Sequence, residues 1–215
     1  DNFKSMQWRP GTVCGVQARV MRISFSGELA YEINIEANYG RYIWDEVALA
    51  GKPWNITPYG TESMHGLRAE KGYIIVGQDT DGSMTPMDVN MKWILAKDKP
   101  FSYIGRRSFS ISALNSDDRF QLVGLLTKDA HVVLPEGSHI INNKGGSIGY
   151  VTSSYFSPIL RRSIAMAQLK GGLSKMTEIV LVKIVQEKQG LKEIPCEVSS
   201  SVFYDIEGEK VDGNE

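Results

Sequence analysis

The chain has 215 residues, 42% of them hydrophobic, and this size and composition suit one or two ordinary globular domains. Its 24 basic and 25 acidic side chains give a net charge of -1, which implies no long-range electrostatic field and argues against a nucleic-acid partner. No apolar run approaches the roughly 18 residues that a membrane-spanning helix needs, which argues against a membrane partner.

The two cysteines, Cys14 and Cys196, lie far apart and form no Cys-x-x-Cys motif. They could pair in principle, but a reduced, cytoplasmic protein is the simpler interpretation. The three histidines are scattered and lack the spacing of metal ligands, so we expect no metal site. The chain starts at Asp1 without a signal-peptide pattern or an initiator methionine, so we expect it to be cut from a longer protein.

The first predicted element is a β-hairpin. Residues 16–25 have the composition of a strand, and Ser26-Gly27 follows as a turn signal. From residue 29 to residue 36, apolar and polar side chains alternate strictly. The pattern predicts a hairpin with one apolar and one polar face, and it places Glu32 on the polar face.

Two helices are expected after the hairpin. Asn38 can cap the first, whose apolar residues recur at helical spacing as far as Gly51. Thr57-Pro58 is typical of a second helix start, with Thr57 as the N-cap, and that helix is expected to end near Gly72. A hairpin followed by two helices predicts an α+β sheet-and-helix domain.

Residues 77–88 form a long polar stretch rich in turn residues, and long loops in compact domains are often functional. Within it, Asp79 and Asp81 resemble part of a calcium-binding loop. The full twelve-residue pattern is absent, so Asx-turns within the loop are the favoured interpretation. Residues 88–96, and a segment that begins at residue 103, each suggest a short helix.

Residues 111–118 are the best linker candidate, and the helical patterns end there. Short strands separated by turns follow, which predicts a small antiparallel six-stranded β-barrel. The expected domains are therefore residues 1–112 and residues 119–215. The six strands are expected at residues 120–126, 139–141, 148–152, 164–169, 178–185 and 194–198.

Several motifs, in order along the chain, resemble those of the glycine-cleavage T-protein (aminomethyltransferase) family. They are the hairpin Phe25–Ile33, the helix Leu67–Tyr73, the loop Gly77–Asp81 with the following Thr85-Pro86 and Trp93, Tyr103-Ile104-Gly105, Leu122–Leu125 and Gly145–Leu169. The resemblance implies that residues 1–112 are the C-terminal part of a folate-binding domain. It implies that residues 119–215 are the complete C-terminal barrel domain, and that tetrahydrofolate is the ligand.

The resemblance also implies three binding residues, and it leaves the catalytic residues unknown. Glu32 matches the glutamate that holds the pterin ring, whose adjacent amino group and ring N–H one carboxylate can bind together. From the alternation alone, Glu32 would be a solvated strand residue. Tyr204 matches a tyrosine that lines the folate site, and Arg68 matches an arginine with a folate-binding or structural role. A further family arginine falls on Met64, and a family aspartate is expected upstream of Asp1.

Within the family, residues 22–28, 56–62, 68–82 and 201–205 resemble the alpha subunits of heterotetrameric sarcosine oxidases. The implied function is capture of the one-carbon unit from oxidative demethylation of sarcosine on tetrahydrofolate, which gives 5,10-methylenetetrahydrofolate. The implied partners are the other sarcosine oxidase subunits, including the flavin-bearing beta subunit. FAD, FMN and NAD are expected only on other domains or subunits, so the isolated chain is expected to be inactive as an oxidase.

Two other functions remain open. The first is a glycine-cleavage T-protein or a dimethylglycine-dehydrogenase-like aminomethyltransferase, and Met64 argues against a true T-protein. The second is a non-catalytic module whose barrel only docks partner subunits. Binding of tetrahydrofolate distinguishes the second from the others.

Overall fold

The computed structural model describes residues 3–96, 98–186 and 190–213. The chain divides into two compact units. Unit 1 comprises Asp1–Arg68 and Asp205–Glu215, and unit 2 comprises Ala69–Tyr204. Among the described residues, none of the helices combines the length and the apolar character that crossing a membrane requires.

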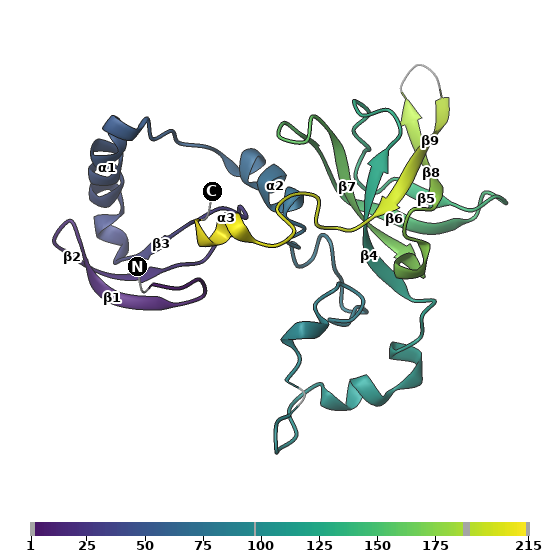
Figure 1. The fold of residues 1–215 in the computed structure, drawn as a ribbon, viewed down its shortest axis with the longest axis horizontal. Helices are drawn as coiled ribbons and strands as arrows, with labels where there is room; N and C mark the ends of the chain where they lie inside the picture. Colours follow the sequence, from purple (N-terminus) through teal and green to yellow (C-terminus); the bar gives the residue numbers. More distant parts are fainter. Residues whose placement is uncertain (1–2, 97, 187–189, 214–215) are drawn as a thin grey trace. The chain divides into compact units, whose positions relative to one another are not determined.

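Unit 1 contains an antiparallel sheet with the strand order β1-β2-β3 (Figure 1). Its strands are β1 (Trp8–Val13), β2 (Val16–Met21) and β3 (Glu32–Asn34). Cys14 and Gly15 connect β1 to β2 and have φ angles of 49° and 80°, as in a two-residue type I′ hairpin turn. Strand β1 was not predicted from the sequence, because Pro10 and Gly11 interrupt its strand pattern.

The predicted hairpin is confirmed, since β2 pairs with β3. The predicted strand lengths are wrong, because β2 ends at Met21 and β3 keeps only three residues. The pairs Met21–Glu32 and Arg19–Asn34 lie directly opposite each other. Directly paired residues point to the same side of a sheet, so these four side chains share one face.

The helices that follow differ from the prediction at their starts. They are η1 (Ala37–Tyr39), α1 (Gly40–Gly51), η2 (Lys52–Trp54) and α2 (Thr61–Glu70). The predicted cap at Asn38 is wrong, because Asn38 lies inside the 3₁₀ turn η1 and makes no capping bond to α1. The cap predicted at Thr57 is also wrong, since α2 begins four residues later and the Thr57 hydroxyl donates to the carbonyl of Asn55 at 3.0 Å.

Arg22 connects the two ends of unit 1. Its guanidinium donates to the carbonyls of Phe3 and of Val211, the latter at 3.1 Å. It also lies 3.5 Å from the carboxylate of Asp212 in the short helix α3 (Glu209–Asp212). The arginine side chain is only 12% exposed, so these contacts hold α3 within unit 1.

Unit 2 begins with the end of α2 and continues through a long region of turns. The helices predicted at residues 88–96 and from residue 103 are 3₁₀ turns and not α-helices. These turns are η3 (Lys92–Ile94), η4 (Arg106–Ser110) and η5 (Ser112–Leu114). The region leads directly into the first barrel strand (Figure 1).

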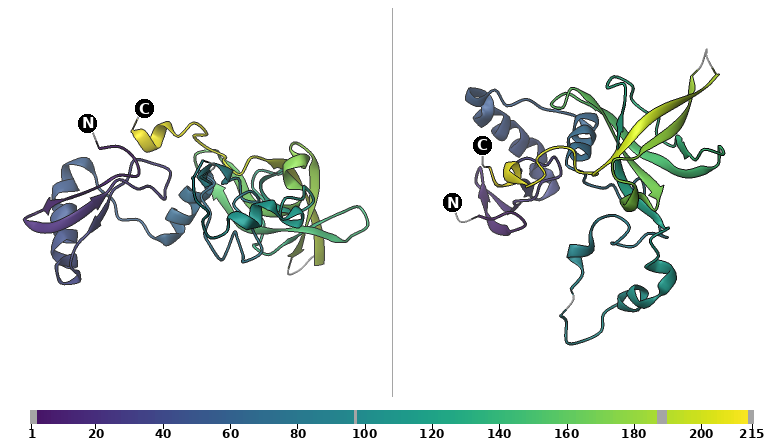
Figure 2. Two further views of the ribbon diagram at one scale, coloured as in Figure 1. Left: turned by 90° about the horizontal axis from the view of Figure 1, so that it is seen from below. Right: turned by 45° about the vertical axis from the view of Figure 1, so that its right-hand side comes forward.

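Within the described residues, six antiparallel strands close into a barrel in the order β4-β7-β6-β5-β8-β9 (Figures 1 and 2). They are β4 (Phe120–Thr127), β5 (His139–Ile141), β6 (Ser147–Ser157), β7 (Arg162–Lys170), β8 (Ile179–Gln186) and β9 (Gly190–Ser199). The predicted barrel is therefore confirmed. The predicted strands overlap the observed ones, although β6, β7 and β9 are longer.

Two groups of buried side chains stabilise unit 2. Inside the barrel, Leu125, Ala167 and Val182 are completely buried, as the alternation of side chains along barrel strands requires. Outside β4 and β7, Leu122 and Met166 pack in a second cluster with Ala69 from α2, Val89 and Phe203. The second cluster fixes the end of α2 and the following loop against the barrel wall.

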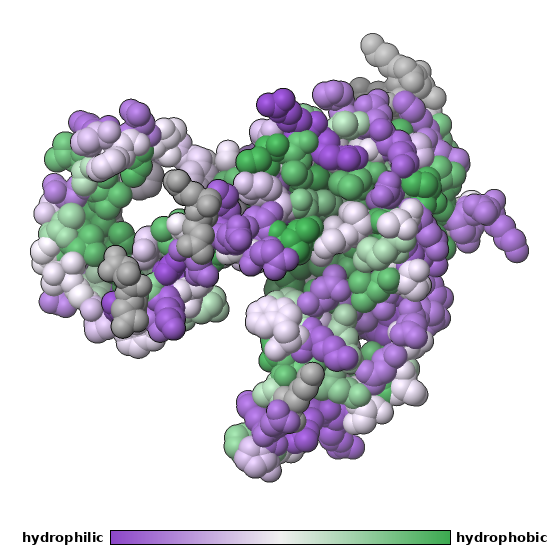
Figure 3. Space-filling view, viewed as in Figure 1, coloured by the Kyte–Doolittle hydropathy of each residue, from purple (hydrophilic) through white to green (hydrophobic). Residues whose placement is uncertain are grey.

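Unit 1 has a much smaller core. Among its described residues, the buried hydrophobic side chains are those of Ala18 and Ile43. Trp44 on α1 and Trp54 in η2 are 62% and 84% exposed. Figure 3 shows hydrophobic residues on the surface of this unit, at the left of the view. Its sheet and helix therefore bury less apolar area per residue than the barrel does.

Candidate functional site

Glu32 is the first residue of β3 and is exposed. Among the described residues, its carboxylate has no hydrogen-bond or ion-pair partner. Both oxygens are therefore available to a ligand. An exposed carboxylate without a protein partner can bind two adjacent N–H groups at once, as the sequence-based hypothesis requires.

The same face of the sheet carries further polar and aromatic groups. The guanidinium of Arg19 lies over the ring of Trp8, 5.3 Å from its centroid. A shallow groove of about 580 Å³ runs beside this pair and is also lined by Asn34 and Glu36. Glu32 does not line the groove, but Asn34 lies two residues along the same face. The face therefore presents a cation, an aromatic ring, an amide and carboxylates.

Tyr204 is half-buried at the end of unit 2. Its backbone N–H and that of Phe203 both donate to the carbonyl of Glu70, at 3.0 and 2.9 Å. In the part of the chain that the structure describes, the Tyr204 hydroxyl has no hydrogen-bond partner. The backbone of Tyr204 is thus fixed by the end of α2, whereas its hydroxyl remains available.

Arg68 lies on α2 and its side chain is completely buried. It therefore differs from Glu32, which is exposed. Glu32 and Tyr204 belong to different units, so the convergence of the two residues that a shared folate site needs stays a prediction.

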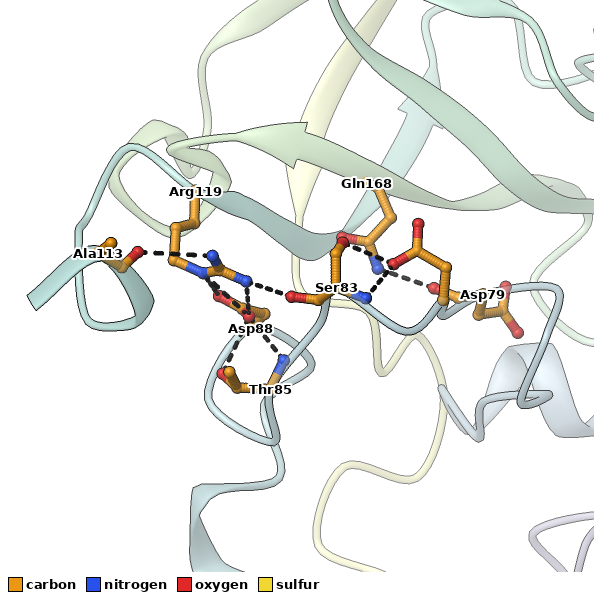
Figure 4. A network of polar contacts seen from close by, with 8 residues as sticks. Asp79, Ser83, Thr85, Asp88, Ala113, Arg119 and Gln168 are labelled. Carbon is orange, nitrogen blue, oxygen red and sulfur yellow. Dashed lines mark hydrogen bonds and ion pairs between the residues drawn. The ribbon is translucent and has the colours of Figure 1, made fainter. Parts of the chain in front are cut away.

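Asp79, from the loop that the sequence marked as a candidate metal site, is completely buried. Its Oδ1 accepts hydrogen bonds from the hydroxyls of Thr152 and Ser153, at 2.6 and 2.7 Å. Its Oδ2 accepts from the backbone N–H of Ile75 at 2.8 Å. The side-chain amide of Gln168 donates to the Asp79 carbonyl at 2.8 Å (Figure 4). Protein donors therefore occupy both carboxylate oxygens.

An irregularity in β6 makes this arrangement possible. The register of β6 against β7 shifts between Val151 and Ser153. In a regular strand, Thr152 and Ser153 would point to opposite faces, whereas a bulge re-aims one of the two side chains. Both hydroxyls consequently reach the same carboxylate oxygen of Asp79. No pattern in the sequence indicated this contact, because a bulge depends on how two strands pair.

Asp81 behaves as the sequence predicted. Its carboxylate accepts from the hydroxyl and the backbone N–H of Ser83, at 2.6 and 2.8 Å, which is an Asx-turn. The hydrogen bonds from the Ser83 hydroxyl and N–H lower the pKa of Asp81. Among the described residues, no three His, Cys, Asp or Glu side chains are grouped closely enough to hold a metal ion.

Asp88 and Arg119 join the end of this loop to the start of the barrel (Figure 4). Arg119 donates through Nε to Oδ1 and through a terminal nitrogen to Oδ2, at 3.0 and 2.8 Å. Thr85 adds its N–H at 2.8 Å and its hydroxyl at 2.9 Å. Burial alone would raise the pKa of Asp88, but the hydrogen bonds from Arg119 and Thr85 and the charge of Arg119 together lower it.

These contacts agree with the favoured interpretation of residues 77–88. The length and polarity of the segment left a functional role open, but turns stabilised by its own side chains were preferred to a calcium site. In the structure, Asp79, Asp81 and Asp88 each bind donors from the protein itself. The loop is therefore a structural connection between α2 and the barrel, and each of these three carboxylates is engaged at one oxygen or at both.

Two protein-family models match the sequence. The model of the GCVT N-terminal domain matches residues 1–99. The model of the glycine cleavage T-protein C-terminal barrel domain matches residues 121–205. The second match spans the strands that form the barrel.

Curated relatives match the chain along most of its length. Sarcosine oxidase subunit alpha from Corynebacterium sp. (strain P-1) is 44% identical over 99% of this chain, and the match covers 22% of that protein. Aminomethyltransferase from Halothermothrix orenii is 30% identical over 79% of this chain, and the match covers 46% of that protein. The chain thus spans between about a fifth and about half of the length of these relatives.

The fold also matches a solved structure. The crystal structure of the glycine cleavage system aminomethyltransferase T from Bartonella henselae has a TM-score of 0.76 to this chain. The match covers 87% of this chain and 50% of that one, at 23% sequence identity. This likeness confirms the predicted α+β fold with its C-terminal barrel.

Proposed function

The chain belongs to the glycine cleavage T-protein family, and from this premise we propose that it is the folate-binding part of a sarcosine oxidase alpha subunit. The higher identity to a sarcosine oxidase subunit, 44% against 30% for an aminomethyltransferase, supports this branch of the family. Residues 1–112 would then supply part of the folate-binding domain, and residues 119–215 the barrel domain.

The exposed carboxylate of Glu32, which has no partner among the described residues, is the observation that carries this proposal. The pterin ring of tetrahydrofolate presents an amino group next to a ring N–H, and one carboxylate accepts both hydrogen bonds. The acceptor oxygens of Glu32 therefore fit the ligand at this point. The free hydroxyl of Tyr204 would provide a second contact. The burial of Arg68 favours the structural role over direct contact with the ligand.

Bound tetrahydrofolate would accept the one-carbon unit released by oxidative demethylation of sarcosine, as 5,10-methylenetetrahydrofolate. The residues of this chain would orient the ligand and exclude water from it. Oxidation of sarcosine would require FAD, FMN and NAD on other domains or subunits, including the flavin-bearing beta subunit. The free thiols of Cys14 and Cys196 fit a reducing, cytoplasmic environment.

Titration of tetrahydrofolate against the complete gene product, assembled with its partner subunits, tests the proposal. We expect Glu32→Ala to weaken binding by about 1.5–3 kcal/mol, because charge-assisted hydrogen bonds are lost. This corresponds to a Kd about 10- to 150-fold higher. Glu32→Gln should lie between the alanine variant and the wild type, since the amide keeps one acceptor but replaces the other with a donor.

Glu193→Ala is the matched control, because Glu193 is also an exposed glutamate on a strand but belongs to β9 of the barrel. Its Kd should equal that of the wild type. Wild-type protein that does not bind tetrahydrofolate would favour a subunit-docking module. Binding that is unaffected by Glu32→Ala would place the ligand elsewhere.

A second experiment concerns the oxidase reaction. The isolated chain should not oxidise sarcosine, because the redox cofactors belong to other parts of the proposed enzyme. Oxygen consumption and reduction of an artificial electron acceptor should both stay at background when sarcosine is added. Oxidation of sarcosine by the isolated chain would contradict the placement of the redox cofactors on other parts of the enzyme.

A further inference from the structure

The backbone between β9 and Tyr204 passes unusually close to two glycines. A Cβ added to Gly124 on β4 would lie 2.1 Å from the carbonyl oxygen of Ser200 and 2.7 Å from the ring of Phe203. A Cβ added to Gly72 would lie 2.5 Å from the carbonyl oxygen of Ser201. Carbon atoms in proteins essentially never approach oxygen so closely, so each position excludes any side chain.

The end of α2 holds the last two residues of the same segment. The carbonyl of Glu70 accepts the backbone N–H groups of Phe203 and Tyr204. The carboxylate of Glu70 accepts the hydroxyl of Ser157 at 2.6 Å, and both side chains are buried. The Ser157 hydroxyl oxygen also accepts the N–H of Leu160 at 3.1 Å. The turn between β6 and β7 therefore fixes Ser157, and Ser157 fixes the carboxylate of Glu70.

We infer that Gly72, Gly124 and Glu70 are positioning residues that place the backbone of Tyr204, and that they thereby set the affinity of the site for tetrahydrofolate. The inference rests on the proposed function, because it concerns the same folate site. Ser200, Ser201 and Phe203 are each constrained, so the point from which the Tyr204 side chain leaves the backbone is fixed before any ligand binds. Pre-organisation of this kind increases affinity by reducing the ordering cost of binding.

Gly72→Ala tests the inference most directly. Real Cβ atoms essentially never come closer than 3.0 Å to a neighbour, so the added Cβ and the Ser201 carbonyl oxygen must separate by at least 0.5 Å from 2.5 Å, and Tyr204 lies three residues further on. We expect the Kd for tetrahydrofolate to rise at least about tenfold, since small displacements of positioning groups have large effects. The experiment uses the complete gene product with its partner subunits.

Gly145→Ala is the matched control. Gly145 has a φ of +78°, close to the +73° of Gly72, but nothing lies within 4 Å of its added Cβ. Both variants therefore carry the same backbone strain, and only Gly72→Ala displaces the segment before Tyr204. Gly145→Ala should leave the Kd within about twofold of the wild type, because surface changes away from a site have small effects.

A double-mutant cycle separates positioning from general destabilisation. If Gly72 acts through Tyr204, then Gly72→Ala should have little further effect on the Kd in a Tyr204→Ala background. Additive effects of the two substitutions would overturn the inference. If Gly72→Ala does not fold, Ser157→Ala replaces it, since it removes the hydrogen bond to Glu70 without adding an atom, and the same non-additivity is expected.

Amide hydrogen exchange provides a readout without ligand. The N–H groups of Phe203 and Tyr204 should exchange at least about tenfold faster in Gly72→Ala than in Gly145→Ala, because their bonds to Glu70 are disturbed. Equal exchange in the two variants would overturn the inference. Wild-type protein that binds no tetrahydrofolate overturns the proposed function and this inference together. Wild-type binding that Gly72→Ala leaves unchanged overturns the inference alone.

Discussion

At the scale of single residues, the structure separates acidic side chains that the fold uses from the glutamate that the family motif selected. Asp79 is buried and accepts three hydrogen bonds through its carboxylate, whereas Glu32 is exposed and has no partner among the described residues. A carboxylate that is already paired cannot bind a ligand without breaking its own bonds. Glu32, and not the acidic loop, is therefore the candidate for ligand binding.

Asp79→Ala should destabilise unit 2 by about 2–4 kcal/mol, because it leaves the buried Ser153 hydroxyl and the Ile75 N–H without their acceptor. Urea unfolding monitored by circular dichroism measures the change. Asp81→Ala is the control, since Asp81 is exposed and its carboxylate, among the described residues, accepts hydrogen bonds from Ser83 alone, and it should cost no more than about 1 kcal/mol. Equal losses in the two variants would show that the buried network has no special role.

The two cysteines should react very differently. Cys14 is exposed, whereas burial raises the pKa of Cys196 to about 12. At about pH 8, iodoacetamide should modify Cys14 quickly and Cys196 only after unfolding, because the thiolate is the reacting form. Mass spectrometry of the alkylated protein measures both. Fast modification of Cys196 in the folded chain would contradict its placement in the barrel core.

Burial of Cys196 also affects stability at high pH. The folded pKa lies above the ordinary value of 9.0, so the folded state favours the neutral thiol. The contribution of this buried thiol to the free energy of unfolding is complete below pH 9.0. It is lost as the pH rises from there towards about 12. Cys196→Ala should show a shallower loss of unfolding free energy over this range. Urea unfolding of both proteins across this pH range measures the difference.

At the scale of elements, the loop of residues 77–88 depends on the barrel for its conformation. One end is held by Thr152, Ser153 and Gln168, and the other by Arg119 just before β4. The bulge in β6 lets both Thr152 and Ser153 reach the first of these ends. The loop and the barrel wall should therefore lose their structure together.

Acid should release the Asp88 end of this loop. The folded pKa of Asp88 lies below its ordinary value of 3.8, so its contribution to stability is present above that pH. The contribution is lost as the pH falls below 3.8 and through the folded pKa. Asp88→Asn should flatten the acid limb of the stability curve and lower stability near neutral pH. Unfolding measured from about pH 6 to about pH 2.5 tests this, and an unchanged acid limb would contradict it.

At the scale of the whole molecule, the two units differ in how much apolar surface they bury. The barrel buries a large cluster that includes Leu125, Val151 and Val182, each at most 1% exposed. The buried hydrophobic residues described in unit 1 are Ala18 and Ile43. Stability follows buried apolar area, so the barrel should be the last part of the chain to unfold.

Hydrogen exchange should therefore be strongly uneven along the isolated chain. Amides of the barrel strands β4, β6 and β7 should exchange at least about 100-fold more slowly than those of β1, β2 and β3, because the latter open without disrupting a large core. Mass spectrometry after proteolysis resolves the two regions. Equal protection in both would indicate that the chain unfolds as one cooperative body.

The barrel and the hairpin were predictable because the patterns that indicate them lie in short stretches of the sequence. Alternation of side chains and turn residues mark strands wherever one face is buried, and these patterns located the strands from residue 120 onward. Helix starts were harder, since Asn38 and Thr57 have the composition of caps but neither occupies a cap position. The short strand β1 was missed because Pro10 and Gly11 suppress the strand pattern, although pairing with β2 tolerates them.

The sequence by itself determined the fold class, the barrel and the family resemblance, because these depend on residue type and spacing along the chain. It also selected Glu32, Tyr204 and Arg68 as candidates, but it could not distinguish a free carboxylate from a paired one. Only the tertiary structure decided that Asp79 and Asp88 bind donors from elsewhere in the protein. Their partners come from a strand bulge and from distant segments, and no local pattern records which residues meet when the chain folds.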